Sequence, residues 1–130
     1  FVRDGMITRF EHLGPGATLG DAADLLTATT QHEFPVLDND RRMIGVLTMR
    51  TLFAGLEQHG RDAPVAAHMD ADLPAIGEHE RLDGALKLLQ QGRRPAVAVI
   101  GRNGSLAGYV TAENLGELMM VHSALDDIPG

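Results

Sequence analysis

The sequence offers few residues whose types and spacing could carry out catalysis. Cysteine is absent, which excludes thiol catalysis, disulfides and cysteine-ligated metal. No nucleophile–base pair or pair of catalytic carboxylates stands out. No two of the histidines lie at i and i+4 on a predicted helix, where they could hold a metal together. We therefore expect this chain not to be an enzyme and to contain no catalytic residue and no metal ligand. The six histidines are His12, His32, His59, His68, His79 and His122.

The segment Glu78-His79-Glu80 is the nearest approach to a metal-binding group. It precedes the cap of a predicted helix, where carboxylates complement the helix dipole without any metal. Its spacing fits no metal-binding template, so we expect no metal here. His122 lies on the apolar face of the last predicted helix and is interpreted as a packing or interface residue.

Two threonines are stronger candidates for a functional role. Thr48 and Thr111 each follow an apolar run containing glycine and precede a predicted helix. A threonine at that place caps the helix, because its hydroxyl accepts a hydrogen bond from a backbone N–H of the first turn. Capping carries no ligand information by itself. Capping alone and capping combined with ligand contact therefore both stay open.

The elements that position these threonines occur twice, at a spacing of 63 residues without a gap. Such a repeat predicts two structural copies, which we place at residues 1–63 and 64–130. The scaffold positions repeat most clearly. Matching pairs are Met6 and Met69, Leu19 and Leu82, Ala22 and Ala85, Leu52 and Leu115, and the runs Gly45-Val46-Leu47-Thr48 and Gly108-Tyr109-Val110-Thr111.

Each copy reads as helix, strand, strand, helix after a short extended lead-in near Phe10 or Leu73. The strands are apolar on both faces, so helices should cover them. We predict an α/β (α+β) fold in which two β-α-β-β-α repeats pack sheet to sheet about a pseudo-twofold axis, leaving two related clefts. The predicted strands are residues 34–37, 43–47, 96–100 and 106–110. The last helix carries an apolar stripe, part of which could be a self-association surface. That stripe is Leu115, Leu118, Met119 and Leu125.

Bulk properties restrict the partners. The formal net charge of −7 disfavours non-specific binding to nucleic acid or to an anionic membrane. No apolar run is long enough to cross a bilayer and no signal peptide is visible, so we expect no membrane insertion and a cytoplasmic location. The chain begins at Phe1 rather than methionine, which we interpret as a piece of a longer protein.

The two ordered copies resemble a tandem pair of CBS domains, a Bateman module. The resemblance rests on Phe34-Pro35-Val36-Leu37-Asp38 and Met43 to Thr48, with second copies at Ala98-Val99-Ile100 and Leu106 to Thr111. It implies a regulatory module that senses an adenosine-type ligand, such as AMP, ADP, ATP or S-adenosylmethionine, and controls an attached effector. It also implies a homodimer formed through the helices. The alternative is a structural dimerisation module with vestigial clefts.

The last helix, Thr111-Ala112-Glu113-Asn114-Leu115-Gly116-Glu117, and the lead-in Met6 to Phe10 resemble the CBS tails of site-2-type membrane zinc metalloproteases. The resemblance implies that such a protease could be the attached effector. The protease motif H-E-x-x-H is absent from this chain, since neither His32-Glu33 nor His79-Glu80 continues it.

The family pattern assigns ligand contacts residue by residue. Its hydroxyl at the helix N-terminus favours phosphate, because unpaired N–H groups and the helix dipole point there. An acidic residue three positions later accepts both ribose hydroxyls, and apolar strand residues enclose the adenine. One cleft would then use Thr8, Glu33, Phe34, Thr111, Glu113 and Asn114. The second cleft would use Thr48, Met49, Thr51, Ala71, Ala96 and Val97.

This sequence departs from the pattern at the ribose position. Asn114 stands there in one copy and Thr51 in the other, so neither copy carries the acidic residue. Asparagine can still bind a diol without charge, whereas threonine is too short to reach it well. We therefore expect the cleft with Thr111 and Asn114 to be the better site, with both clefts empty as the alternative.

Overall fold

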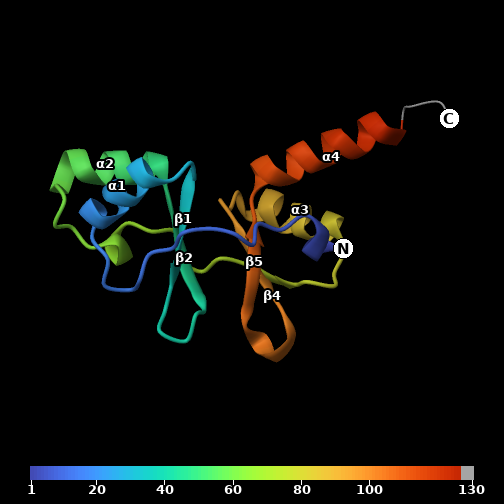
Figure 1. Cartoon of the computed structure of the whole chain (residues 1–130), viewed down its shortest axis with the longest axis horizontal. Helices are drawn as coiled ribbons and strands as arrows, with labels where there is room; N and C mark the ends of the chain where they lie inside the picture. The colour runs from blue at the N-terminus through green and yellow to red at the C-terminus, as the bar shows by residue number, and fades with distance from the viewer. Residues whose placement is uncertain (127–130) are drawn as a thin grey trace. The chain divides into compact units, whose positions relative to one another are not determined.

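The computed structural model describes the backbone of residues 1–126 (Figure 1). Side chains at 119, 121–123, 125 and 126 lie outside this description, and with them the expectations for Met119, His122 and Leu125. Contacts divide the chain into two compact units. The first-repeat unit is Arg9–Leu73, and the second-repeat unit joins Phe1–Thr8 to the part of the chain that begins at Pro74.

The first-repeat unit is a two-stranded antiparallel sheet covered by two helices. Strand β1 (Glu33–Leu37) pairs with β2 (Met43–Thr48), and the sheet is flanked by α1 (Leu19–Ala28) and α2 (Met49–His59). Helix α1 begins at a capping box, because Thr18 Oγ1 accepts from the Asp21 N–H while an Asp21 oxygen accepts from the Thr18 N–H. The predicted strands are confirmed, and Thr18 caps its helix in the way predicted for Thr48 and Thr111.

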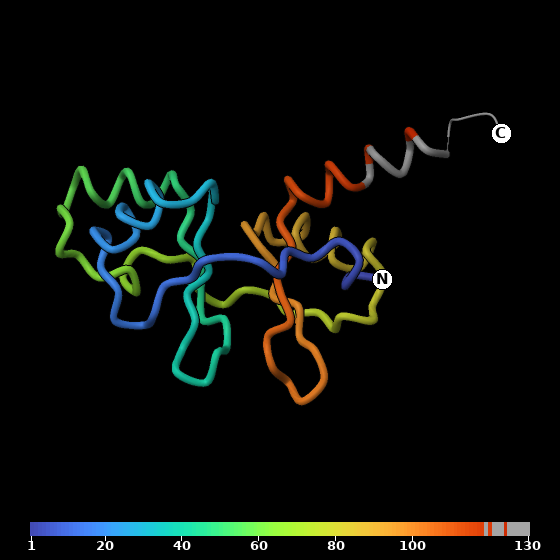
Figure 2. Tube along the Cα trace, viewed as in Figure 1, coloured from blue at the N-terminus to red at the C-terminus, as the bar shows by residue number. Residues whose placement is uncertain are grey.

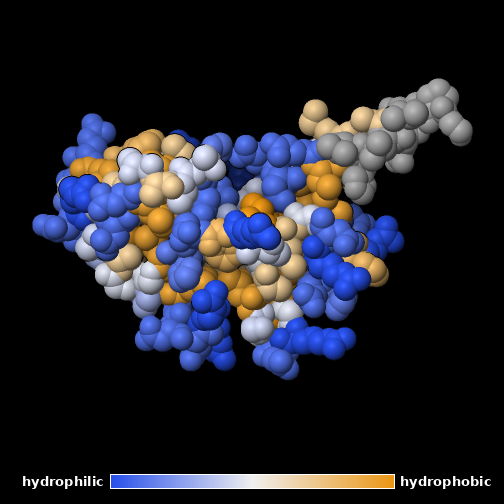
Figure 3. All heavy atoms as spheres, in the orientation of Figure 1, coloured by the Kyte–Doolittle hydropathy of each residue, from blue (hydrophilic) through white to orange (hydrophobic). Residues whose placement is uncertain are grey.

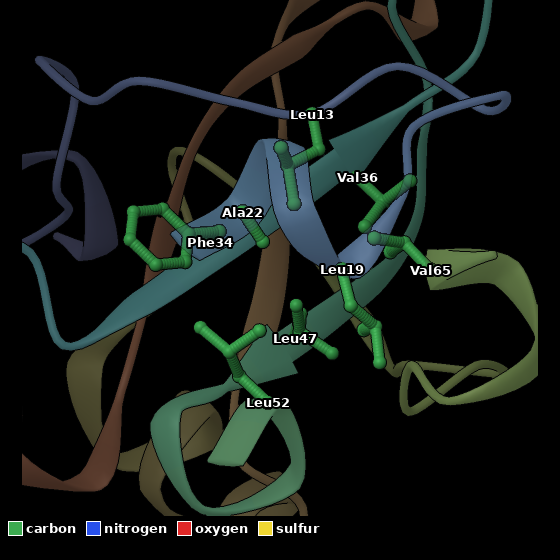
Figure 4. Packing of buried hydrophobic residues seen from close by; sticks show 8 residues of the cluster. All are labelled: Leu13, Leu19, Ala22, Phe34, Val36, Leu47, Leu52 and Val65. Atoms are coloured by element: carbon green, nitrogen blue, oxygen red, sulfur yellow. The ribbon is translucent and has the colours of Figure 1, made fainter. Parts of the chain in front are cut away.

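The core of this unit lies between the sheet and its helices, as Figure 4 shows. Leu19 and Ala22 supply one face of α1, and Leu52 supplies the first turn of α2. These helix side chains pack against Phe34 and Val36 of β1 and Leu47 of β2. Strands that are apolar on both faces need helices to cover them in this way. The buried cluster is Leu13, Leu19, Ala22, Phe34, Val36, Leu47, Leu52 and Val65.

The second-repeat unit repeats this plan with one more strand. Strand β3 (Ala75–Gly77) runs parallel to β4 (Val97–Ile100), which pairs antiparallel with β5 (Leu106–Val110). Helices α3 (Leu82–Gly92) and α4 (Ala112–Asp126) complete the unit. The expected mixed α/β architecture is therefore confirmed within each unit. The buried cluster is Val2, Ala85, Leu89, Val97, Val99, Val110 and Leu115.

The segment that leads into each repeat packs on the other repeat. Residues 1–8, which we call the leading strap, run beside β5 in Figure 2, where Ile7 and Tyr109 exchange backbone hydrogen bonds of 2.7 and 3.1 Å. The equivalent segment of the second repeat pairs in the same way with β2, because Asp70 and Val46 exchange two bonds of 2.9 Å. The two short 3-10 helices, Val2–Asp4 and Val65–Ala67, are placed equivalently as well.

The packing units therefore differ from the sequence boundary between residues 63 and 64. The 63-residue periodicity identifies equivalent residues. It does not show whether a leading segment pairs with the strand of its own repeat or with the equivalent strand of the other repeat. The strap completes the second-repeat unit, and residues 64–73 complete the first. The division into repeats at 1–63 and 64–130 remains a statement about sequence equivalence.

The free ends of both hairpins are polar, as Figure 3 shows. In the β1–β2 loop, Asp38 Oδ1 accepts from the N–H groups of Asp40 and Arg42, which holds the turn without help from the core. In the β4–β5 loop, Asn103 and Gly104 both adopt positive φ, of 68° and 72°. Asparagine and glycine are the residues that tolerate this geometry best.

Candidate functional site

Thr111 lies between the end of β5 and the start of α4 and is 7% exposed. Its Oγ1 accepts a hydrogen bond of 3.1 Å from the Asn114 N–H, which makes Thr111 the helix cap expected from the sequence. The Asn114 side chain closes the turn in return, because its Oδ1 accepts from the N–H and the hydroxyl of Thr111 at 2.6 and 3.1 Å. Thr111 and Asn114 are thus brought together by one capping arrangement.

The Asn114 amide also holds the leading strap. Its Nδ2 donates a 2.6 Å hydrogen bond to the carbonyl oxygen of Gly5, a residue 109 positions away. Sequence reasoning missed Gly5 because a backbone carbonyl leaves no mark in residue type. The only available signal was that Gly5 lies 63 residues before His68, in the segment that precedes each repeat.

A hollow of about 320 Å³ opens at the junction of the strap and α4. Glu117 and Leu118 lie one turn after Asn114 on the helix, and their side chains form one wall. The hollow is open rather than enclosed, with an acidic residue on each of its two walls. Its lining residues are Asp4, Gly5, Met6, Asn114, Glu117 and Leu118.

The other residues of the better predicted cleft are distributed over both units. Thr8 is exposed at the end of the strap, and Glu113 is exposed in the first turn of α4. Glu33 begins β1 and is half-buried, whereas Phe34 is 0% exposed and belongs to the core of the first-repeat unit (Figure 4). A Phe34 side chain packed in this way has a structural role. The gathering of these residues around one ligand remains a prediction.

The second predicted cleft offers fewer polar groups. Thr48 caps α2, and its hydroxyl donates a 3.0 Å hydrogen bond to the Thr51 hydroxyl, so the two threonines already satisfy each other. Met49 is half-buried at the start of α2. Ala96 and Val97 are fully buried, and Val97 is part of the core of the second-repeat unit. Ala71 is exposed and contributes no polar side-chain atom.

The segment Glu78-His79-Glu80 binds the strap through its backbone. The carbonyl oxygens of Glu78 and Glu80 accept hydrogen bonds from the N–H groups of Arg3 and Val2 at 3.0 and 2.7 Å. His79 Nε2 lies 3.4 Å from a carboxylate oxygen of Glu78, and His79 is exposed whereas Glu78 is half-buried. Within the described part of the chain, no three histidine or acidic side chains gather closely enough to hold a metal ion.

The sequence of the chain is similar to a known domain family and to a named relative. The model of the CBS domain family matches residues 2–57. The magnesium and cobalt efflux protein CorC of Escherichia coli K12 is 30% identical to the chain over 125 residues. That alignment covers 92% of this chain and 41% of CorC, so the chain spans about two fifths of that relative.

Solved structures agree on the fold. A hemolysin-like protein containing a CBS domain, from Oenococcus oeni PSU, has a TM-score of 0.81 at 19% identity, covering 89% of this chain and 87% of its own. CBSX2 in complex with AMP has a TM-score of 0.75 at 22% identity, covering 94% and 97%. The CBS domain pair of MJ0100, in complex with 5-methylthioadenosine and S-adenosyl-L-methionine, has a TM-score of 0.77 at 18% identity, covering 93% and 96%.

These matches show that the chain has the fold of a CBS domain pair, and the CBS domain model itself matches residues 2–57. The comparisons do not support a site-2-type zinc metalloprotease as the longer protein that contains this chain. The relative described above, CorC, is named as an efflux protein. Among the described residues, no helix is long and apolar enough to span a bilayer.

Proposed function

We propose that this CBS pair is a regulatory module that binds an adenosine-type nucleotide at the Thr111 and Asn114 turn and thereby controls an attached effector. The carrying observation is the buried cap at Thr111, which fixes the first turn of α4 at the end of β5. The N–H groups of such a turn and the helix dipole favour a phosphate. CBS pairs of the same fold are found with AMP and with S-adenosyl-L-methionine, which supports an adenosyl ligand here.

The two predicted clefts are unequal under this proposal. Asn114 still presents an amide hydrogen, whereas Thr51 is shorter and already accepts from Thr48. The Thr111 and Asn114 site is therefore the one we assign to the nucleotide, with Thr8, Glu33, Phe34 and Glu113 as its proposed surroundings. The site formed by Thr48, Met49, Thr51, Ala96 and Val97 is the weaker one.

The effector is proposed from the relatives alone. CorC contains a region similar to this chain within a longer protein, and CorC is named as a magnesium and cobalt efflux protein. We infer that the module belongs to a larger protein of which it regulates another part. An efflux protein is the effector that the comparison favours, and a membrane zinc metalloprotease remains the hypothesis drawn from the sequence.

A thermal-shift titration with AMP, ADP, ATP and S-adenosylmethionine tests the ligand. A ligand that binds only the folded chain stabilises it by about 2.7 kcal/mol at one hundred times its Kd. We expect AMP to raise the Tm of the chain and Thr111→Ala to abolish that rise. Thr18→Ala is the matched control, since it removes a cap from α1 in the other unit and should lower the Tm without removing the response.

A dimerisation module with unused clefts is the second candidate. Phe53 on α2 and Met120 on α4 are 52% and 73% exposed, which leaves large apolar side chains in water on the helices through which we expect a homodimer. A chain that light scattering finds dimeric, and that no nucleotide stabilises at millimolar concentration, would favour this candidate over the nucleotide sensor.

A further inference from the structure

The Asn114 side chain has nearly exhausted its hydrogen-bonding capacity. A carbonyl oxygen has two lone pairs, and the N–H and hydroxyl of Thr111 fill both on Oδ1. The amide nitrogen has two hydrogens, of which one is donated to the Gly5 carbonyl oxygen. A single N–H therefore remains for any ligand.

The orientation of this amide follows from its partners. Turning it over would place the nitrogen against the Thr111 N–H, which is also a donor, and the oxygen against the Gly5 carbonyl, which is also an acceptor. Aspartate, the residue that the family pattern has at this position, could accept from Thr111 but could not donate to Gly5. Asparagine thus allows one side chain to join the helix cap to the strap.

The bond to Gly5 is one of a series that holds the strap in the second-repeat unit. Upstream, the strap donates from Val2 to Glu80 and from Arg3 to Glu78, and the Val2 side chain is 0% exposed. Downstream, Ile7 pairs with Tyr109 on β5. Asn114 provides the side-chain bond between these two backbone attachments, at the place where the strap passes α4.

We propose that Asn114 is a clasp for the leading strap and that the clasp opens when a ribose diol donates both of its hydroxyl hydrogens to Asn114. The diol part of this inference rests on the proposed nucleotide function. A diol that donates two hydrogen bonds to Asn114 must replace those from Thr111, because no acceptor position is free. The side chain then turns, Gly5 loses its donor, and the strap is loosened. While it is closed, the clasp offers a ligand a single N–H, from which a hydroxyl or phosphate oxygen can accept.

Amide hydrogen exchange of the whole chain without ligand tests the clasp. Asn114→Asp should speed exchange at Val2, Arg3 and Ile7 by about tenfold, the effect of losing one hydrogen bond to a partly buried carbonyl oxygen that then lacks its donor. Asn103→Asp is the matched control, because it makes the same charge change at an exposed turn of the same unit. Unchanged strap exchange in Asn114→Asp, within twofold of the control, overturns the clasp.

Two further readings keep that result interpretable. Exchange in the paired strands β4 and β5 reports whether Asn114→Asp remains folded. Asn114→Ala removes the donor without adding charge, and it should loosen the strap in the same way. If Asn114→Asp loosens the strap and Asn114→Ala does not, charge repulsion rather than the lost donor is responsible, and the clasp is overturned.

The diol coupling is tested with AMP and with its 2′,3′-dideoxy analogue. AMP should speed strap exchange in the native chain, whereas the dideoxy analogue should bind and leave it protected. Binding of AMP with unchanged strap protection overturns the coupling. If neither AMP nor ADP, ATP or S-adenosylmethionine binds the native chain, the nucleotide function fails and the coupling fails with it, while the clasp is still decided by the exchange measured without ligand.

Discussion

Two glycines are required by the close approach of another backbone. A Cβ placed on Gly108 would lie 2.5 Å from the carbonyl oxygen of Ile7, and one on Gly45 would lie 2.9 Å from that of Asp70. Ile7 and Asp70 are the residues that pair with β5 and β2. We call residues 1–8 and 64–73 the exchanged segments, because each packs in the unit that holds the strands of the other sequence repeat. The glycine in the repeated run before each capping threonine leaves the space that the backbone of the exchanged segment occupies.

We expect Gly108→Ala to lower the free energy of unfolding by about 1–3 kcal/mol, because the added methyl group meets a backbone atom that cannot move away without breaking the strap pairing. Gly116→Ala is the control, since a Cβ there meets nothing within 4 Å. In the helix interior that control should gain up to about 1 kcal/mol. Urea denaturation measures both, and equal stability of the two variants would contradict the close approach.

At the scale of elements, the side chains of each exchanged segment match in size the helix residues that they contact. On the strap, Gly5 offers no side chain and faces Leu118 of α4, whose Cδ2 would lie 2.5 Å from an added Cβ. In the first-repeat unit the sizes are reversed. Gly55 of α2 stands at the position equivalent to Leu118, and His68 at the position equivalent to Gly5. A Cβ added to Gly55 would lie 2.6 Å from Leu19 Cδ1 and 3.5 Å from His68 Nδ1. The two segments are therefore not interchangeable.

A double-mutant cycle on Gly5→Ala and Leu118→Ala tests this fit. Gly5 has φ of −122°, which alanine adopts freely, so a loss on Gly5→Ala comes from side-chain contacts, of which Leu118 Cδ2 at 2.5 Å is closer than Leu82 Cδ2 at 3.2 Å. We expect that substitution to cost about 1–3 kcal/mol alone and much less beside Leu118→Ala, a coupling of about 0.5–3 kcal/mol. Gly14→Ala, where a Cβ meets nothing within 4 Å, serves as the control. Strictly additive losses would argue against the fit.

At the scale of the whole molecule, each unit is completed by residues from the other sequence repeat. The strap contributes Val2 to the core of the second-repeat unit, and residues 64–73 contribute Val65 to the core of the first. A fragment cut at the sequence boundary would therefore leave one buried valine and one strand pairing unsatisfied. Units of this size are marginal even when complete.

We expect fragments 1–63 and 64–130 to be largely unfolded alone and to gain structure when mixed, since each then supplies the other's missing segment. Far-ultraviolet circular dichroism of the separate and mixed fragments measures the gain. A fragment 9–73, which keeps its own exchanged segment, should be more structured than 1–63. Independent folding of both 1–63 and 64–130 would contradict the conclusion that each unit needs a segment from the other sequence repeat.

The sequence was sufficient for those features that depend on neighbouring residues. The caps at Thr48 and Thr111, the hairpin strands and the α/β class follow from local turn chemistry and apolar patterning, and all are confirmed. The pairing of Ile7 with Tyr109 could not be predicted in this way, because repeat periodicity is the same whether a segment joins its own copy or the other. The role of the Asn114 amide was missed for the same reason, since it depends on Gly5.

The exchange also has a consequence for synthesis on the ribosome. Residues 9–73 contain everything that the first-repeat unit needs, so that unit can close early. The strap emerges before it, yet its partners Glu80, Tyr109 and Asn114 are added much later. Contacts so far apart in sequence form slowly because a long loop must be closed first. During that interval Val2 and Ile7 stay exposed to chaperones and proteases, so the earliest residues of this chain are among the last to be protected.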